Sequence, residues 1–396
     1  MFKKSGEASN NKGFFARHRL AIAICTLMGT IIGAGILGIP YVVAKSGFLL
    51  GLFWILGLGA AFLLLNLFVG EIVLRTKTKH QLAGYAEKYL GQWGKLAMGV
   101  AVIFGTYGAL TAYLIGEGAT LYSLFSWGSP LMYSLFFFLI GFIIVYLGMK
   151  ATGKAELILV SFLILTVVSI GIFSINKINT NYYNVASWGF VFLPYGVILF
   201  AYMGFAAIPE ISEELGREKK KMKVAILVGS IIPIILYALF AVIVVGLVGV
   251  QNFDLLQPNE RIATIALSFY SHHIFGVFAN ILAVLTMFTS FIALSMVLLQ
   301  IYEYDYGIKH RWALLFSFSL PLLITILNLT SFITILGIVG ALTGGLSGIV
   351  TVLTYWKAKQ KGERVPEYSL PKLTLLGILL ILIFVLGIVY EIYHLF

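Results

Sequence analysis

GTIIGAGILGIPY, residues 29–41, holds four glycines and one proline in thirteen positions, and it lies inside a run of apolar residues. Both residue types weaken a helix, glycine through its backbone entropy and proline because it lacks an N–H donor. At membrane depth, backbone groups that a break sets free must face protein or a water-filled cavity. The stretch therefore predicts a discontinuous helix, or alternatively a helix packed through small residues such as Gly29 and Gly33.

The composition of the chain sets its class. The 396 residues are 60% hydrophobic and 11% charged, with a mean hydropathy of +0.99, which is more apolar side chain than a soluble domain can bury. Apolar runs recur that are long enough to cross a hydrocarbon core of about 30 Å. We expect an all-α polytopic membrane protein with eleven spans, at residues 20–44, 48–74, 95–125, 130–149, 155–175, 188–209, 223–250, 273–302, 312–327, 332–356 and 372–395.

The positive charges predict the orientation of these spans. With the N-terminus inside, the inside segments carry 24 Lys and Arg residues and the outside segments carry only Lys45, Lys177 and Arg261. This asymmetry indicates a cell-membrane protein with a cytoplasmic N-terminus and, after eleven spans, a C-terminus outside. It also explains the net charge of +11 without nucleic acid. The basic segment 217–223, REKKKMK, is predicted to lie beside anionic lipid.

A second break occurs in FAYMGFAAIPE, residues 200–210, within the sixth predicted span. Interrupted segments at corresponding positions of two halves indicate an inverted repeat with a binding site between the copies. Five spans in each copy force the copies into opposite orientations, and one helix is left over. We therefore expect a basic cytoplasmic tail at 1–19, five-helix repeats at 20–175 and 188–356, and an extra helix at 372–395.

Three stretches carry a resemblance to a known family. GTIIGAGILGIPYVVAKSGF, GEIVLRTKTKHQLAGYAEKYLG and FAYMGFAAIPEISEEL resemble the amino acid/auxin permease family, within the amino acid–polyamine–organocation superfamily. The resemblance implies the leucine-transporter fold with discontinuous first and sixth helices. It also implies import of amino acids by alternating access, coupled to sodium or protons.

The two breaks carry the candidate substrate site. An amino acid carboxylate needs donors, which free N–H groups at the start of a half-helix supply. Its ammonium group needs acceptors, which unwound carbonyls supply, and its side chain needs an apolar pocket, for which the two phenylalanines beside the second break are candidates. Packing in the core or against lipid is the alternative for these phenylalanines. The candidate substrate residues are Gly33, Ala34, Gly35, Tyr113, Phe200, Ala201, Met203 and Phe205.

Hydroxyl side chains in the eighth span form the candidate ion site. Thr286, Thr289 and Ser290 share one helical face. The resemblance implies that such hydroxyls complete a sodium site with carbonyls of the first span, at Gly29 and Ile32. Hydroxyls in membrane helices also bond back to their own helix, which is the alternative. The fifth span lacks the lysine that some proton-coupled relatives place here, so we expect sodium, and protons stay open.

Glu117 lies in the third span, where carboxylates are costly and indicate function. It follows Tyr113 by one turn, and the resemblance implies that this tyrosine hydroxyl reaches the substrate carboxylate. A role in proton coupling or gating is expected, with a solvated or helix-bridging acid near the outer interface as the alternative. Glu71 and Glu210 fall near inside helix ends and are expected to contact basic residues there.

No enzyme motif, metal-binding cluster of Cys or His, or nucleotide-binding loop occurs in the sequence. We therefore expect a transporter with no cofactor except a coupling sodium ion. Its expected partners are a small amino acid and the lipid bilayer, and no obligate protein partner is evident. The alternatives are a channel, and a membrane amino acid sensor or receptor built on a transporter fold.

Overall fold

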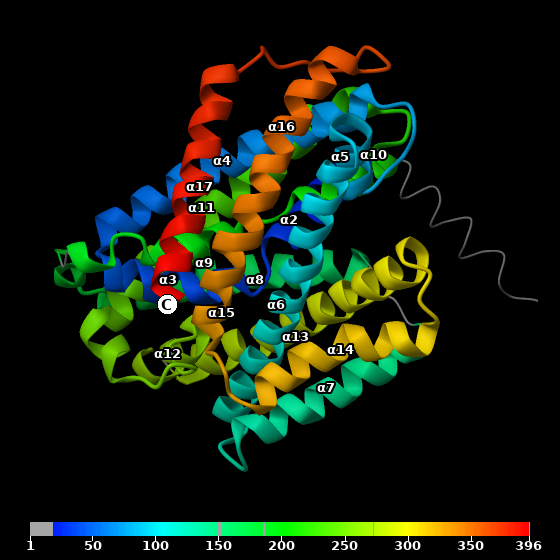
Figure 1. The fold of residues 1–396 in the computed structure, drawn as a ribbon. Helices are drawn as coiled ribbons and strands as arrows, with labels where there is room; N and C mark the ends of the chain where they lie inside the picture. The colour runs from blue at the N-terminus through cyan, green and yellow to red at the C-terminus, as the bar shows by residue number, and fades with distance from the viewer. Residues whose placement is uncertain (1–18, 149–152, 185–186, 272, 396) are drawn as a thin grey trace, which may run out of the picture.

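The computed structural model describes residues 19–148, 153–184, 187–271 and 273–395, and these ranges are helical with short connections (Figure 1). The predicted tail at 1–19 lies outside the described residues except for Arg19. The α-helices are α2 (Arg19–Ile31), α3 (Gly35–Ser46), α4 (Phe48–Arg75), α5 (Leu82–Leu90), α6 (Gln92–Phe125), α7 (Pro130–Tyr146), α8 (Gly153–Ser174), α9 (Leu193–Ala201), α10 (Ile208–Leu215), α11 (Met222–Leu255), α12 (Ala263–Tyr270), α13 (His273–Gln300), α14 (His310–Ile326), α15 (Phe332–Val339), α16 (Gly345–Lys361) and α17 (Thr374–Leu395).

Helix length and hydropathy confirm a multi-pass membrane protein. Among the described residues, seven helical segments are long and apolar enough to cross a membrane: α4, α6, α9 with α10, α11, α13, α15 with α16, and α17. The pair α2 and α3, bent by 53° at residues 32–34, counts as an eighth. Three shorter apolar helices lie at 130–146, 161–177 and 310–326.

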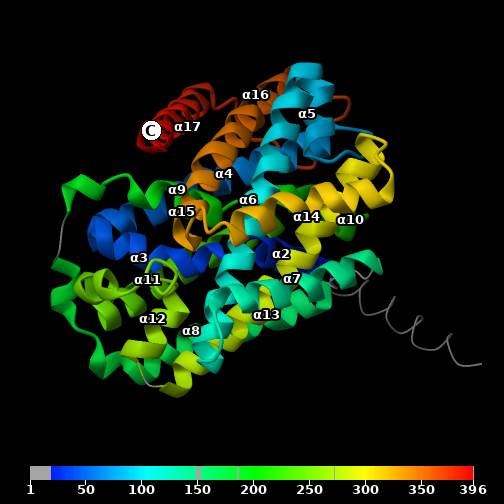
Figure 2. The ribbon, with the colours of Figure 1, turned by 60° about the horizontal axis from the view of Figure 1, so that its bottom comes forward.

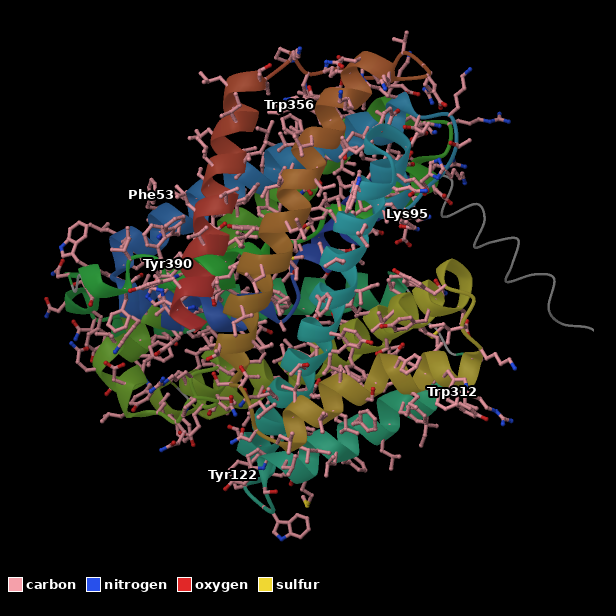
Figure 3. All side chains as sticks on the ribbon, in the orientation of Figure 1. Phe53, Lys95, Tyr122, Trp312, Trp356 and Tyr390 are labelled. Carbon is pink, nitrogen blue, oxygen red and sulfur yellow. The ribbon has the colours of Figure 1, made fainter. Side chains whose placement is uncertain are left out.

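Helix α6 organises one side of the molecule. It packs against α7, α13, α14, α15 and α16, so it contacts elements from most of the chain. Figures 1 and 2 show α7, α13 and α14 gathered on one side of α6, and α16 and α17 on the other. Figure 3 labels Lys95 and Tyr122 near the two ends of α6, the first close to α5 and the second beside the turn that leads to α7.

Two helices lie where the sequence analysis expected only joints, at α5 and α12. Helix α5 is amphipathic: Leu82, Tyr85, Ala86 and Tyr89 are buried, and they recur at the spacing of one helical face. It packs on α6 and α16. Such helices are too short to span a membrane, so the apolar-run criterion missed them. The sixth span also begins later than predicted, at Leu193, and α10 continues it to Leu215.

Glu71 ties α4 to the far end of the chain. Its side chain is fully buried, and it forms ion pairs of 2.8 Å with both Arg75 and Lys359. The backbone N–H of Leu370 donates to its other oxygen at 2.7 Å. The expected contact with basic residues is thus confirmed for Glu71. For Glu210 the expectation is wrong in this structure, since its side chain is exposed and forms no ion pair within the described ranges.

The connection between α16 and α17, residues 362–373, also contacts α4, α5 and the segment between them. The carboxylate of Glu363 pairs with Lys88 at 2.7 Å and accepts the backbone N–H of Lys77 at 2.8 Å. The hydrogen bond from Lys88 and then that from Lys77 lower the pKa of Glu363. The hydroxyl of Tyr368 donates to the carbonyl oxygen of Leu67 at 2.6 Å. The segment is therefore fixed against α4 and α5.

Candidate functional site

The first break separates α2, which ends at Ile31, from α3, which begins at Gly35. The backbone N–H of Gly33 turns back to the carbonyl oxygen of Ile31 at 2.9 Å. Ala34 occupies the N-cap position of α3 and is fully buried, and no side chain caps this helix start. The first N–H groups of a helix have no acceptor within the helix. The start of α3 is therefore a buried set of donors with the positive end of the helix dipole, an arrangement that suits an anion.

The second break follows α9, which ends at Ala201. The backbone N–H of Met203 donates to the carbonyl oxygen of Phe200 at 3.1 Å, and that of Gly204 donates to Tyr202 at 2.8 Å. A single short helical turn at 205–207 then leads into α10. The carbonyl of Phe200 thus already accepts one hydrogen bond, and a carbonyl oxygen can accept a second.

The two breaks lie against each other. Helix α3 packs on α9, and α2 packs on α10. A Cβ atom placed on Gly35 would lie 2.5 Å from the Cα of Ala201, and one on Gly204 would lie 2.3 Å from a side-chain carbon of Ile31. Gly35 is required by this close approach to the backbone of Ala201, whereas Gly204 makes room for the side chain of Ile31. Gly33 differs, because its nearest neighbour would be the hydroxyl of Tyr113 at 3.5 Å.

Tyr237 of α11 joins the two breaks. Its hydroxyl lies 2.7 Å from the carbonyl oxygen of Ile31 and 3.0 Å from that of Ala201, which are the last residues of α2 and α9. The tyrosine is fully buried, and its ring centre is 5.1 Å from that of Tyr202. The sequence analysis missed this residue. A tyrosine inside an apolar span was the available signal, since a buried phenol requires a partner.

Apolar side chains surround the second break. Phe205 is buried and stacks on Phe62 with ring centres 6.1 Å apart. Phe200 and Met203 are partly buried. The sulfur of Met203 would lie 3.1 Å from a Cβ placed on Gly344. These side chains give the region an aromatic and thioether wall.

The three side chains whose hydroxyls were predicted to bind the ion differ in their burial and hydrogen bonding. The Thr286 hydroxyl is buried and has no hydrogen-bond partner within the described residues. The Thr289 hydroxyl donates to the carbonyl oxygen of Thr286 at 3.1 Å, as in the alternative of bonding back to its own helix, and Ser290 is partly buried. Gly29 lies on α2, which packs mainly on α8, α10 and α11, and Ile32 directly follows this helix. Helix α13 packs on α6, α8 and α12, so α8 is the shared neighbour of the two halves of this predicted site.

Glu117 is fully buried in α6, and in the described part of the chain neither carboxylate oxygen has a hydrogen-bond partner. The solvated alternative is therefore wrong in this structure. The adjacent positions face other helices: a Cβ on Gly116 would meet Phe332, and one on Gly118 would meet Ser134. A carboxyl group in such a place needs either a proton or a counter-charge.

Comparisons with known proteins agree on the class. A model of the tryptophan/tyrosine permease family matches residues 16–394. "Tyrosine-specific transport system 1" of Haemophilus influenzae is 24% identical over 85% of this chain and 88% of its own length. "Glutamine transporter 2" of Aliivibrio fischeri is 25% identical over 80% of this chain and 83% of its own. The solved structure of MhsT in complex with L-phenylalanine has a TM-score of 0.70 at 16% identity, covering 93% of this chain and 98% of MhsT.

The likeness to MhsT confirms the leucine-transporter fold that the resemblance implied. The matching family is the tryptophan/tyrosine permease family, and the name amino acid/auxin permease is not confirmed. The chain is a transport protein of the amino acid class and not an enzyme. Since the family model matches residues 16–394 of 396, the chain belongs to the tryptophan/tyrosine permease family.

Proposed function

We propose that this protein imports an amino acid by alternating access, coupled to an ion gradient. The observation that carries the proposal is the meeting of the uncapped, buried start of α3 with the carbonyl ends of α2 and α9. The N–H groups of Ala34 and Gly35 would bind the carboxylate, joined by that of Gly33 once it releases the carbonyl oxygen of Ile31, and carbonyls at residues 200–203 would accept from the ammonium group. Oppositely charged groups of one amino acid are thus matched by oppositely polarised helix ends.

We infer an aromatic or large apolar side chain for the substrate. Phe205 with Phe62, together with Phe200 and Met203, supplies an apolar wall beside the second break. One relative is named for tyrosine and the solved structure of MhsT is titled as a complex with L-phenylalanine, and both names support a substrate of this kind. Another relative is named for glutamine. An aromatic ring buries a large apolar area and prefers tilted contacts with other rings.

We also infer two inverted repeats, at 20–175 and 188–356, with the helix at 372–395 outside them. Helices at equivalent places in the two halves pack on each other: α4 on α11, α6 on α13, and α7 on α14. The first half-helix of each copy packs on the second half-helix of the other copy, α2 on α10 and α9 on α3. Two antiparallel copies of one discontinuous helix produce this pairing. Adding the three shorter apolar helices to the eight spans gives eleven crossings. The N-terminus is then cytoplasmic and the C-terminus outside.

Sodium is the coupling ion that we propose first. The buried Thr286 hydroxyl without a partner supports a ligand role, with Thr289, Ser290 and the carbonyls of Gly29 and Ile32 completing the set in the ion-bound state. Neutral oxygen ligands suit a hard monovalent cation. Proton coupling is the second candidate, because the buried carboxyl of Glu117 also has no partner in the described residues.

Counterflow in proteoliposomes tests the proposal. Vesicles loaded with unlabelled tyrosine should accumulate labelled tyrosine, tryptophan or phenylalanine from outside, because a carrier exchanges substrate across the membrane. Binding of the labelled amino acid without counterflow would favour the sensor alternative. Accumulation driven by an inward sodium gradient at equal pH supports sodium, and accumulation driven by a proton gradient in sodium-free buffer supports Glu117.

A further inference from the structure

A pocket of about 250 Å³ lies between the segment after α4 and the helix α10 that follows the second break, and Pro209 at the start of α10 is one of its lining residues. One wall is the segment from the end of α4 to α5, with Lys77, Thr78, Lys79 and His80. The other wall is α10 and the turn after it, where Lys219 is the basic residue. The volume is below the range of about 300–1,000 Å³ that drug-sized ligands occupy, so the pocket suits a small group.

The charges in this pocket do not balance. Its lining contains three lysines and a single acid, Glu213, which pairs with Lys79 at 3.1 Å. Lys77 and Lys219 form no ion pair within the described ranges. The nearby carboxylate of Glu363 accepts the backbone N–H of Lys77, but its ion pair is with Lys88. Two ammonium groups thus stay available to an anion.

The remaining polar lining also fits an oxyanion. The hydroxyl of Thr78 lies 2.7 Å from a ring nitrogen of His80 and accepts from Lys88 at 3.1 Å. Ser212 adds a buried hydroxyl on the α10 side. Hydroxyl and ammonium donors on both walls can surround a tetrahedral group with several acceptor oxygens. A phosphate is such a group, and it binds lysine as a point charge.

We propose that this pocket binds a phosphate group, supplied by the headgroup of an anionic phospholipid. The basic segment 217–223 continues the α10 wall, and clusters of four to eight Lys or Arg at the cytoplasmic end of a membrane helix are a recognised lipid-headgroup pattern. Free inorganic phosphate is the other source of the same chemistry. The proposal does not depend on the amino acid site, so each can fail without the other.

The test measures lipid binding by native mass spectrometry of the detergent-solubilised full chain. Wild type is compared with Lys77→Gln/Lys219→Gln, which removes both free ammonium groups of the pocket. Lys357→Gln/Lys361→Gln is the matched control, since it removes the same charge from exposed residues that line no part of the pocket. Lys77→Arg/Lys219→Arg keeps the charge. Phosphatidylglycerol, phosphatidylcholine and inorganic phosphate are the probes, at about 0.15 M salt, where the Debye length is about 8 Å.

Wild type and the control should prefer phosphatidylglycerol over phosphatidylcholine by at least about tenfold. The pocket variant should lose about tenfold or more in phosphatidylglycerol affinity, the effect of losing one or two charge-assisted hydrogen bonds. The arginine variant should bind within about threefold of wild type. Displacement of the lipid by millimolar phosphate assigns the pocket to free phosphate. Equal lipid binding by the pocket variant and the control overturns the proposal.

Discussion

Tyr237→Phe removes a hydroxyl that reaches both helix breaks, and it leaves the ring in place. The hydroxyl has a single proton, so it donates fully to only one of the two carbonyl oxygens, at 2.7 Å or 3.0 Å, at any moment. A buried carbonyl that loses a donor costs about 1–3 kcal/mol, and the lower end applies to Ile31, whose carbonyl oxygen keeps the N–H of Gly33 at 2.9 Å. That corresponds to about 5- to 150-fold in an equilibrium constant.

The kcat/KM of uptake should fall by the same factor. If the bond forms in one state of the cycle and not in the other, its loss shifts their populations by this amount. The assay is initial uptake of labelled tyrosine in proteoliposomes, with kcat/KM corrected for inserted protein. Substrate-free protein should also unfold at a lower temperature in detergent, because the bond exists before substrate binds.

Tyr368→Phe is the matched control. Its hydroxyl also donates to a backbone carbonyl, that of Leu67 at 2.6 Å, but it lies in the connection between α16 and α17, away from the breaks. Both variants should lose thermal stability to a similar extent, and only Tyr237→Phe should lose transport. Equal transport by the two variants would refute the idea that Tyr237 positions the breaks.

Four further changes test other parts of the site. Gly35→Ala should abolish labelled-substrate uptake, because the new Cβ would lie 2.5 Å from the Cα of Ala201. Thr286→Ala should weaken sodium activation of uptake about 5- to 30-fold, since a lost ligand costs about 1–2 kcal/mol. Glu117→Gln should flatten the pH profile of uptake, because an amide does not titrate. Glu71→Gln should lower the free energy of unfolding by about 1–3 kcal/mol in denaturant titrations, because it leaves two partly buried cations without their carboxylate.

Each of these changes has a control. Gly57→Ala adds the same methyl group into open space and should keep uptake. Thr289→Ala should affect sodium activation less, and an effect equal to that of Thr286→Ala would contradict the ligand role of the buried hydroxyl. Glu117→Asp keeps a titratable group and should keep the pH dependence of uptake. A flat pH profile in this variant would mean that altered packing, and not the loss of a titratable group, explains the effect of Glu117→Gln. Glu218→Gln breaks the exposed pair with Lys221 and should cost no more than about 1 kcal/mol.

The spans could be predicted because membrane helices need long apolar runs, and such runs are visible without any tertiary information. Gly33 and Gly35 indicated the first break because glycine weakens a helix interior, and Pro209 indicated the second because proline favours the first turn of a helix, which is where it lies in α10. What Gly35 faces could not be predicted. Its contact with Ala201 depends on how two segments more than 160 residues apart approach each other.

The polar parts of the site were harder to predict. Tyr237 and Phe62 take part through contacts between helices, which the local sequence does not show. A phenol inside an apolar span indicated that Tyr237 needs a partner, but not which one. Thr286 and Thr289 look equivalent in the sequence, but only the hydroxyl of Thr289 bonds back to its own helix. Glu117 stood out because charge is rare in a span, whereas its complete burial was decided by the packing around it.

The ion pairs of Glu71 have a mechanical consequence. The pair with Lys359 connects α4, from the first half of the chain, to α16 in the second half, and the hydrogen bond from Leu370 adds the backbone segment that leads into α17, whereas the pair with Arg75 lies within α4. The buried carboxylate with these two contacts opposes separation of α4 from α16 at that end. We propose that bending in the transport cycle is concentrated at residues 32–34 and 202–204, where no continuous helix resists it. The breaks would serve as hinges inside each half, and the rest of each half would act as a stationary frame.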